Sequence, residues 1–339
     1  MSALSEEVLA VNNEAVHTLI PVIVYICLLI VIGLLGNPLV IYFYGIKQKP
    51  SPSFMYVISL AVFDLITCAI VMPMELVIVV KFYTFDSPAC CKTIRFFSYF
   101  STIASALTLM LISVDRYRKI CKPLDYQISS KAAKISLLVI VAFSLLLSAP
   151  AAVFYDIIQV NLTKSEDLEG LNCGVPYDVS YKDVIAVYNF SFFILFGCCV
   201  IVLILLYSLI GRQLFKMKNS PVRRHSHART SHQIKTRKYT VVMLLISATF
   251  VGSYLPFLAL STMITVSDGS EPDVYSKAKL AAFQIFIRSY FLSSICNPII
   301  YGLMNNDFKI FLVNLFCRCQ RDRFDLPAER STTNTEQTS

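Results

Sequence analysis

Charged residues are scarce in this chain of 339 residues. They make up 15% of the sequence, whereas hydrophobic residues make up 56%. A soluble domain usually carries about 25% charged residues, so the excess apolar surface must face lipid. The sequence also lacks an internal repeat, a long low-complexity run and any segment with the composition of a separate soluble domain. These absences exclude a soluble globular protein and indicate an integral membrane protein.

Histidine and metal-ligand clusters are missing from the long apolar runs, and the three histidines at 225, 227 and 232 lie in a basic loop. A membrane enzyme would need a catalytic constellation, so we expect no enzyme and no metal centre. A transporter would more often show repeated halves and interrupted helices, and a channel would need a filter loop or rings of charge. Neither pattern is present in the sequence.

The apolar runs themselves predict membrane-spanning helices. A span needs roughly 20 mostly apolar residues, and in lipid a helix pairs its own backbone groups. Runs of this length cover residues 19–45, 54–80, 93–116, 134–155, 184–211, 239–265 and 279–303. The sequence therefore predicts an all-α membrane protein with a seven-transmembrane helix bundle over residues 19–303.

Lysine and arginine lie mainly on one side of the predicted bundle. Loops rich in these residues face the cytoplasm, so the net charge of +8 reflects membrane topology rather than nucleic-acid binding. The cations on this side are Lys47, Lys49, Arg116, Arg118, Lys119, Lys122, Lys131, Lys134, Arg212, Lys216, Lys218, Arg223, Arg224, Arg229, Lys235, Arg237 and Lys238, with five more in the tail. We expect a multi-pass plasma-membrane protein whose C-terminus is cytoplasmic.

Residues 1–18 then form an extracellular N-terminus. They include three acidic residues and no cationic segment, so they do not resemble a cleavable signal peptide. We expect the first helix to direct insertion.

Polar residues inside the predicted spans need compensation. An aspartate at a helix centre costs about 2.5–3.5 kcal/mol on insertion scales, and Asp64 lies in the middle of the second span. The residues at comparable depth are Asn37, Ser105, Ser293, Ser294 and Asn297. They can supply hydrogen bonds to Asp64 or share a cation with it; a purely structural network is the alternative.

Several strings of residues stand in a fixed order along the spans. They are Gly36-Asn37, Leu60-Ala61-x-x-Asp64, Asp115-Arg116-Tyr117, Pro256 and Asn297-Pro298-x-x-Tyr301. Taken singly, each string is weak evidence for any protein family; Asp115-Arg116, for instance, would equally suit an anchor at the membrane interface. Together, and in these helices, they resemble the rhodopsin-like (class A) family of G-protein-coupled receptors. The resemblance covers about residues 19–317.

This resemblance implies roles for individual residues. Arg116 would hold the resting state beside Asp115 and then contact a heterotrimeric G protein. The Asp64 cluster would be a sodium-sensitive site, with Na⁺ as an allosteric ion and no other cofactor. Tyr207 and Tyr301 would close over the inner cavity in the active state. Cys91 would form the family's disulfide with Cys173; Cys90 adjoins it, but Cys91 stands at the family's spacing from Asp115.

The chain departs from the family because it has no tryptophan. An aliphatic residue, Ile140, fills the fourth-span tryptophan position, and Tyr254 stands where a ligand-responsive tryptophan is expected. Cys199 replaces the usual fifth-span proline. Thr236 replaces the acid that often pairs with the third-span arginine, so we hypothesise appreciable signalling without ligand.

Two ligand classes are disfavoured by what is missing. Opsins need a lysine where this chain has Phe291, and amine receptors need an aspartate where it has Ser98. Residues expected to line the ligand pocket are Glu75, Arg95, Ser98, Tyr99, Thr102, Tyr188, Phe257, Ser261, Gln284, Ile287, Arg288 and Phe291. A pocket with both charge signs favours an extracellular peptide, most simply a neuropeptide; a small lipid or nucleotide is the alternative.

The second outer loop is acidic. Its acids, Asp156, Glu166, Asp167 and Glu169, either attract basic peptides or only solvate the loop. Asn161 begins an N-x-Thr glycosylation acceptor in this loop. Asn189 begins a second one, but it falls inside the fifth span, so we expect it to be unused.

The C-terminal region reads as a membrane-surface helix followed by a tail. Apolar and polar residues alternate over 304–317 in a pattern typical of an amphipathic helix on the inner leaflet. Cys317 and Cys319 follow, as palmitoylation candidates or as free thiols. Residues 318–339 are expected to be disordered, with serines and threonines available to receptor kinases and arrestins.

Overall fold

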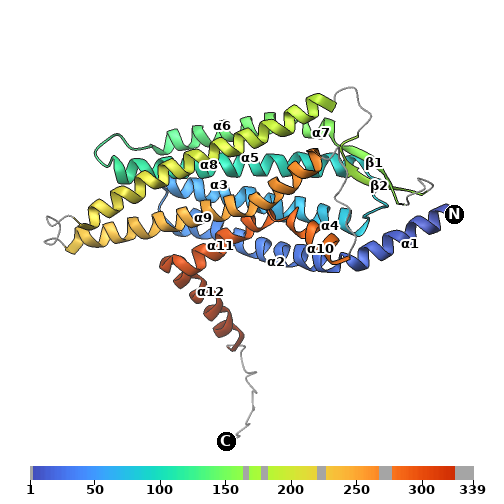
Figure 1. The fold of residues 1–339 in the computed structure, drawn as a ribbon. Helices are drawn as coiled ribbons and strands as arrows, with labels where there is room; N and C mark the ends of the chain where they lie inside the picture. The colour runs from blue at the N-terminus through green and yellow to red at the C-terminus, as the bar shows by residue number, and fades with distance from the viewer. Residues whose placement is uncertain (1–2, 163–167, 177–181, 220–226, 267–276, 325–339) are drawn as a thin grey trace, which may run out of the picture.

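The computed structural model describes residues 3–162, 168–176, 182–219, 227–266 and 277–324. Its main body is an elongated bundle of roughly parallel and antiparallel helices (Figure 1). The helices are α1 (Ala3–Thr18), α2 (Ile20–Tyr42), α3 (Pro52–Ile66), α4 (Met72–Val80), α5 (Pro88–Cys121), α6 (Ser130–Ser148), α7 (Ala151–Phe154), α8 (Lys182–Asn219), α9 (His227–Val266), α10 (Lys277–Phe286), α11 (Phe291–Met304) and α12 (Asn306–Phe324). Two wide π-helical turns, η1 (Phe43–Lys47) and η2 (Thr67–Val71), extend α2 and join α3 to α4.

Seven passes through the bundle are formed by α2, α3–α4, α5, α6–α7, α8, α9 and α10–α11. Among the described residues six of these helical passes are long and apolar enough to cross a membrane, and Phe291–Met304 is a shorter apolar helix. The sequence prediction of a seven-helix bundle is confirmed. The passes built on α5, α8 and α9 extend beyond the predicted spans, because polar residues at their ends continue the helical hydrogen bonding.

The predicted seventh span is wrong in one respect: it is two helices rather than one. Between α10 and α11 the backbone tightens, and the amides of Arg288 and Ser289 bond the carbonyls of Ile285 and Phe286, three residues back, at 3.1 Å. Such tight turns interrupt an α-helix. Tyr25 of α2 donates its hydroxyl to the Arg288 carbonyl at 3.3 Å, which fixes the break against the first pass.

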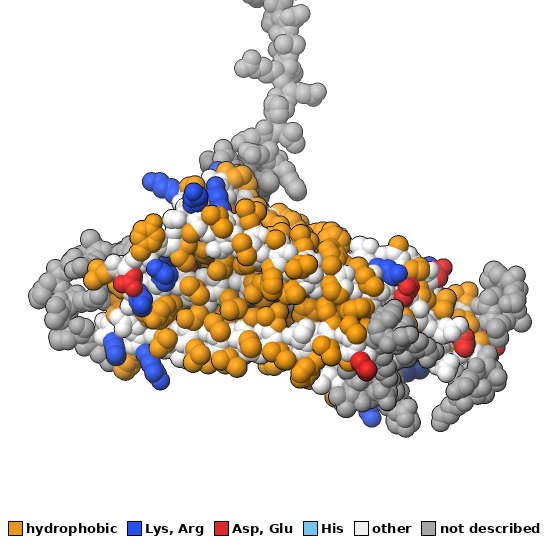
Figure 2. Space-filling model, turned by 90° about the horizontal axis from the view of Figure 1, so that it is seen from above, with side chains coloured by type: hydrophobic (Ala, Val, Ile, Leu, Met, Phe, Trp, Pro, Cys, Tyr) orange, Lys and Arg blue, Asp and Glu red, His pale blue; other side chains and the backbone are white. Residues whose placement is uncertain are grey.

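The core runs along the centre of the bundle around α5, which packs against α3, α6, α8 and α9. Helix α2 approaches α11 closely because Gly36 has no side chain: a Cβ there would lie 2.6 Å from Cγ of Pro298. The outer faces carry exposed leucines, isoleucines and valines. Figure 2 shows one such face: hydrophobic side chains predominate along its middle, and most of the lysines and arginines in view lie toward the end that carries α12.

The opposite end of the bundle, here called the hairpin end, carries two strands that the sequence did not predict. They are β1 (Asp156–Asn161) and β2 (Glu169–Gly174), paired antiparallel with Ile157 opposite Cys173. Residues 3–18, expected only to be an extracellular N-terminus, form α1 at this end. Asn12 of α1 accepts a hydrogen bond from the Tyr83 amide at 2.9 Å and donates to the Val80 carbonyl at 3.3 Å.

Helix α12 diverges from the bundle at the other end, here called the α12 end (Figure 1). Its predicted boundary is wrong, because the helix continues past residue 317 to Phe324. No glycine or proline interrupts residues 318–324, so nothing in them stops the helix. The side chains of Cys317 and Cys319, and the rest of the predicted disordered tail from residue 325, lie outside what is described.

Candidate functional site

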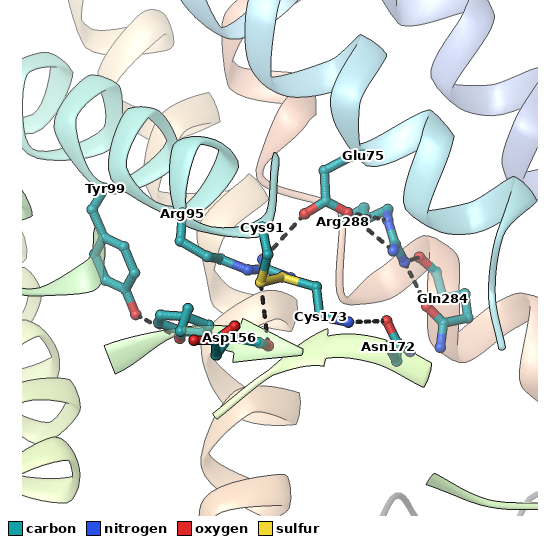
Figure 3. Close-up of polar contacts among 10 residues, drawn as sticks. Glu75, Cys91, Arg95, Tyr99, Asp156, Asn172, Cys173, Gln284 and Arg288 are labelled. Carbon is teal, nitrogen blue, oxygen red and sulfur yellow. Dashed lines mark hydrogen bonds and ion pairs between the residues drawn. A yellow bond between two sulfur atoms is a disulfide. The ribbon is translucent and has the colours of Figure 1, made fainter. Parts of the chain in front are cut away.

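A charged cluster lies in the interior of the hairpin end (Figure 3). Glu75 of α4 is buried, and its carboxylate oxygens lie 3.1 Å from Nη1 of Arg95 on α5 and 3.1 Å from Nη2 of Arg288. Arg288, in the break between α10 and α11, also donates to the side chain of buried Gln284. The structure therefore joins four of the residues predicted to line the ligand pocket.

The β-hairpin is fixed over this cluster by a covalent bond. Cys91, one turn before Arg95 on α5, forms a disulfide with Cys173 of β2, and Cys90 is a free thiol. The predicted pairing is confirmed. Beside it, Asp156 of β1 accepts a hydrogen bond from the Ile157 amide at 2.8 Å and pairs with Lys92 at 3.0 Å. The amide and then the lysine hold the pKa of Asp156 below its ordinary value.

This pairing bears on the proposed attraction of basic peptides. Asp156 already has a cationic partner, so its charge is not free for a ligand. Glu169 is exposed on β2, whereas Glu166 and Asp167 lie outside the described residues. Asn161, the predicted glycosylation site, is exposed at the end of β1.

Tyrosines and phenylalanines line the bundle below the charged cluster. The Tyr99 hydroxyl contacts that of Tyr155 at 3.2 Å and donates to Asn189 at 3.1 Å. The Tyr99 ring also lies 5.7 Å from that of Tyr188. Asn189, the second acceptor motif, is thus engaged inside the bundle.

Tyr254 lies deeper and joins α9 to α5. Its hydroxyl lies 2.9 Å from that of Thr102, and its ring lies 4.5 Å from Phe250 and 5.7 Å from Tyr290. Because Thr102 donates its own hydroxyl hydrogen to the Ser98 carbonyl at 2.7 Å, Tyr254 is the donor in the contact between the two hydroxyls. Of the remaining predicted pocket residues, Phe257 contacts Tyr290, Phe291 is buried, and Ser98, Ser261 and Ile287 are half-buried.

A polar cluster occupies the middle of the bundle. Asn297 of α11 donates to the buried carboxylate of Asp64 at 2.6 Å, and Ser294 lies beside the same carboxylate. Asn37 of α2 donates to the Ser294 carbonyl at 3.0 Å, while its own Oδ1 is buried without a partner. Ser105 of α5 and Ser293 of α11 are also buried, but the structure shows no hydrogen bond from either hydroxyl to Asp64; Ser293 donates to the Tyr290 carbonyl instead. The predicted network is therefore centred on Asp64, Asn297, Ser294 and Asn37.

Arg116 lies at the α12 end of the bundle, where it contacts an acidic side chain, a hydroxyl group and an aromatic ring. It is buried and donates to Asp115 and to Ser53 of α3. Its guanidinium carbon lies 4.7 Å from the ring centroid of Tyr239 on α9. Lys119 shares the Asp115 carboxylate at 2.9 Å. Asp115 thus neutralises part of a two-cation cluster, and Tyr239 covers the arginine from the sixth pass.

A cavity of about 370 Å³ opens beside Arg116. Its walls come from η1, α3, α5, α9, α11 and α12, and they include Phe54, Arg116, Lys119, Thr236, Tyr239 and Asn305. A basic hollow lined by the ends of several passes is able to accept a protein segment that carries acceptor groups. Residues 36–301 of the chain match the family described as 7 transmembrane receptor (rhodopsin family).

The chain belongs to this family.

Three relatives show which curated receptors the chain is similar to. The [Phe13]-bombesin receptor of Bombina orientalis is 30% identical over 298 residues, which cover 85% of this chain and 74% of the relative. The neuropeptide F receptor of Drosophila melanogaster is 26% identical over 86% of this chain and 61% of its own length. Neuropeptide Y receptor type 2 of Bos taurus is 25% identical over 97% of this chain and 84% of its own length.

Family membership makes the receptor a G-protein-coupled signalling protein of the membrane rather than an enzyme. The motif residues lie in the helices in which the family has them: Arg116 lies near the end of α5, and Asn297-Pro298 lies in α11. Pro256 lies inside α9, and Tyr117 follows Arg116 near the end of α5.

One predicted pairing is not present in this state of the receptor. The Tyr207 hydroxyl contacts Ser247 of α9 at 3.2 Å. The Tyr301 hydroxyl is buried without a hydrogen-bond partner, and its ring packs against Tyr44 and Phe308. The two tyrosines are not joined in this structure, and their closing over the inner cavity in the active state stays a prediction.

Sequence reasoning missed Tyr155, Tyr239, Ser53 and Asn12. Each acts through a contact with a distant part of the chain, so local sequence gives little signal. Tyr239 had one available signal: it stands three residues, about one helical turn, after Thr236, where a residue could reach the same arginine.

Proposed function

We propose that the receptor binds a peptide at the hairpin end, outside the cell, and activates a heterotrimeric G protein at the α12 end, in the cytoplasm. The observation that carries the proposal is Arg116, buried at the edge of the basic cavity and held by Asp115 and Tyr239. The bombesin, neuropeptide F and neuropeptide Y receptors named above support a neuropeptide as the ligand class.

The mechanism follows from a two-state equilibrium. In the resting arrangement Tyr239 of the sixth pass lies over Arg116, and the Tyr207 hydroxyl is engaged by Ser247. A ligand that binds the alternative arrangement more tightly shifts the population toward it. Moving α9 away from Arg116 would free the guanidinium for the G protein and release Tyr207 toward Tyr301.

The test is nucleotide exchange on purified G protein by the full-length receptor in nanodiscs, screened with a neuropeptide library. We expect one or more peptides to stimulate exchange and Arg116→Ala to abolish the stimulation while peptide binding remains. Stimulation by nucleotides or lipids but by no peptide would contradict the ligand class. Transport or hydrolysis without exchange would contradict the receptor mechanism.

We also propose that the Asp64 cluster holds a sodium ion in the resting state. Asp64 supplies the one carboxylate, and the unpartnered Oδ1 of Asn37 and the nearby serine hydroxyls supply neutral oxygens. Oxygen donors of this kind suit a hard cation. The ion would offset the cost of a buried carboxylate and add a contact that joins the second and seventh passes.

The sodium proposal is tested by thermal melting of the receptor in sodium chloride and in potassium chloride of equal ionic strength. We expect a higher melting temperature in sodium for the wild type and no difference for Asp64→Asn. Equal melting of the wild type in both salts, or a sodium effect that persists in Asp64→Asn, would contradict the site.

Receptor kinases and arrestins remain proposed partners of the tail, and Cys317 and Cys319 remain proposed palmitoylation sites. The support for these partners and sites is the sequence alone.

A further inference from the structure

Two arginines share one carboxylate at the hairpin end. Glu75 meets Nη1 of Arg95 through Oε1, and Nε and Nη2 of Arg288 through Oε2, all at 3.1 Å. Among the described residues no second acid pairs with either arginine. The cluster therefore carries one positive charge more than its internal partners neutralise. A buried excess charge is costly unless something compensates it.

The two arginines differ in how fully they are engaged. Arg288 uses all three nitrogens: Nε and Nη2 face Glu75, and Nη1 donates to the Gln284 carbonyl at 3.2 Å and to the Gln284 side chain. Its side chain is 8% exposed. Arg288 is thus satisfied by the receptor itself and needs no ligand.

Arg95 is not satisfied. Its Nε is buried and has no acceptor, although Nη1 is paired with Glu75. Its side chain is 24% exposed, against 8% for Arg288, so Arg95 is the more accessible of the two arginines. The ring of Tyr155, 5.3 Å from the guanidinium carbon, covers one face. A ring face attracts a cation but supplies no hydrogen-bond acceptor for the in-plane Nε and no neutralising charge.

We propose that Arg95 is the recognition site for a carboxylate of the ligand. The free edge of a guanidinium presents parallel N–H groups that match the two oxygens of a carboxylate. The site rests on the proposed function, because it assigns the ligand's chemistry at the same end of the bundle. On a peptide the group is the free C-terminus or the side chain of an aspartate or glutamate.

The fold gives this carboxylate a defined place. Arg95 lies one turn from Cys91, whose disulfide fixes β2, and one turn from Tyr99, which begins the aromatic lining (Figure 3). A ligand with its anionic group at Arg95 would lie against the hairpin and extend toward Tyr99 and Thr102. Arg95 then determines where the anionic group of the peptide lies in the bundle.

The alternative is that Arg95 is only a second structural partner of Glu75. Stability distinguishes the two roles. Because Arg288 alone can hold Glu75 through two nitrogens, we expect Arg95→Gln to melt close to the wild type and Arg288→Gln to melt well below it, measured on receptor in nanodiscs without ligand. Equal losses in both variants would overturn the proposal.

Binding is tested by affinity selection with random heptapeptide pools. The pools end in a free carboxylate or a carboxamide, and each is made with and without aspartate and glutamate. We expect the wild type to enrich a carboxylate-bearing pool roughly tenfold or more over the amidated pool without acids, as loss of a charge-assisted bond predicts. Comparison among the pools shows whether the C-terminus or a side chain supplies the group.

The variants complete the test. Arg95→Gln should remove the enrichment, whereas Lys92→Gln, which removes a neighbouring cation already paired with Asp156, should keep it. No enrichment by the wild type, or enrichment that persists in Arg95→Gln, would overturn the proposal. Nucleotide exchange on the same preparations separates the proposal for Arg95 from the proposed function. Exchange driven by amidated peptides without acidic residues would overturn carboxylate recognition by Arg95 alone. Carboxylate-selective binding without exchange would overturn the proposed function alone.

Discussion

At the scale of single residues, the receptor replaces one family interaction with another. Thr236 cannot neutralise Arg116 from the sixth pass, but the ring of Tyr239 lies 4.7 Å from the guanidinium. A cation–π contact is worth about 0.5–2 kcal/mol, which is weaker than a well-desolvated ion pair. In the proposed mechanism an aromatic ring of α9 therefore takes the place of the acid in the resting state, and the hypothesis of appreciable ligand-free signalling stays a prediction.

Tyr239→Leu tests this contact. Removing the ring should raise ligand-free nucleotide exchange by about twofold or more, because the lost contact favours the state in which α9 has moved. Tyr239→Phe is the matched control: it keeps the ring and removes only a hydroxyl that is buried without a partner. Basal exchange that rises equally in both variants would show that the ring does not hold Arg116.

Residue-scale contacts of this kind were only partly predictable. Asp64 was found because a charge inside an apolar run is costly wherever it lies. Arg116 was found because the Asp115-Arg116-Tyr117 string resembles that of the receptor family. Ser53 and Tyr239 were missed because a serine or tyrosine near a helix end has no such cost, and only folding brings them to Arg116.

At the scale of secondary structure elements, two glycines in the helices have opposite surroundings. Gly36 of α2 faces the ring of Pro298, whereas Gly197 of α8 has nothing within 4 Å of an added Cβ. Gly36 is therefore a packing residue that sets the distance between the first and seventh passes.

Substitution by alanine should separate these two positions. Gly36→Ala should destabilise the receptor by about 1–3 kcal/mol through overpacking, because the proline ring cannot rotate away. Gly197→Ala should leave the melting temperature unchanged or raise it, because alanine favours the helix over glycine. Thermal melting of both variants in nanodiscs checks this, and equal melting would show that α2 and α11 separate without cost.

The hairpin depends on its disulfide in a similar element-scale way. Because the disulfide closes a loop of 82 residues, it lowers the entropy of the unfolded chain and so stabilises the folded receptor by about 4.5 kcal/mol on the chain-entropy scale. Cys91→Ser and Cys173→Ser should each lower the amount of folded receptor at the cell surface, and the double variant should be no worse than either. Cys90→Ser is the control and should match the wild type in surface staining. If Cys90→Ser lowered surface staining as much as Cys91→Ser, the assignment of the disulfide to Cys91 would be contradicted.

Element boundaries show where sequence information ends. Apolar length predicted every pass, because lipid imposes a minimum length on each one. The break between α10 and α11 was not predictable, because residues 287–290 contain neither glycine nor proline. Contacts from other passes accompany the break: Glu75 binds the Arg288 side chain and Tyr25 binds its carbonyl.

At the scale of the whole molecule, the positions of the lysines and arginines predict which end of the bundle faces the cytoplasm. Most lysines and arginines of the loops fall at the α12 end, and the cytoplasmic side of a membrane protein carries this excess. The proposed ligand site and the proposed G-protein site then lie on opposite sides of the membrane.

Epitope tags at the two termini test the orientation. On intact cells we expect an antibody to stain the tag before residue 1 and to stain a tag after residue 339 only once the membrane is permeabilised. The permeabilised cells are the control for expression of both tags. Staining of the C-terminal tag on intact cells would contradict the proposed orientation and would place the hairpin end inside the cell.

The break in the seventh pass also limits how force can travel along the receptor. A continuous helix would carry a push at Arg288 to Asn297 as a rigid lever. Because the helix is divided, the turn can absorb part of such a displacement. The contacts that can carry the rest to the sixth pass are the Ser289–Ser253 hydrogen bond at 2.7 Å and the tilted rings of Tyr290 and Tyr254, whose centroids lie 5.7 Å apart. The seventh pass therefore moves as two short helices, and both are coupled to the sixth pass at the break.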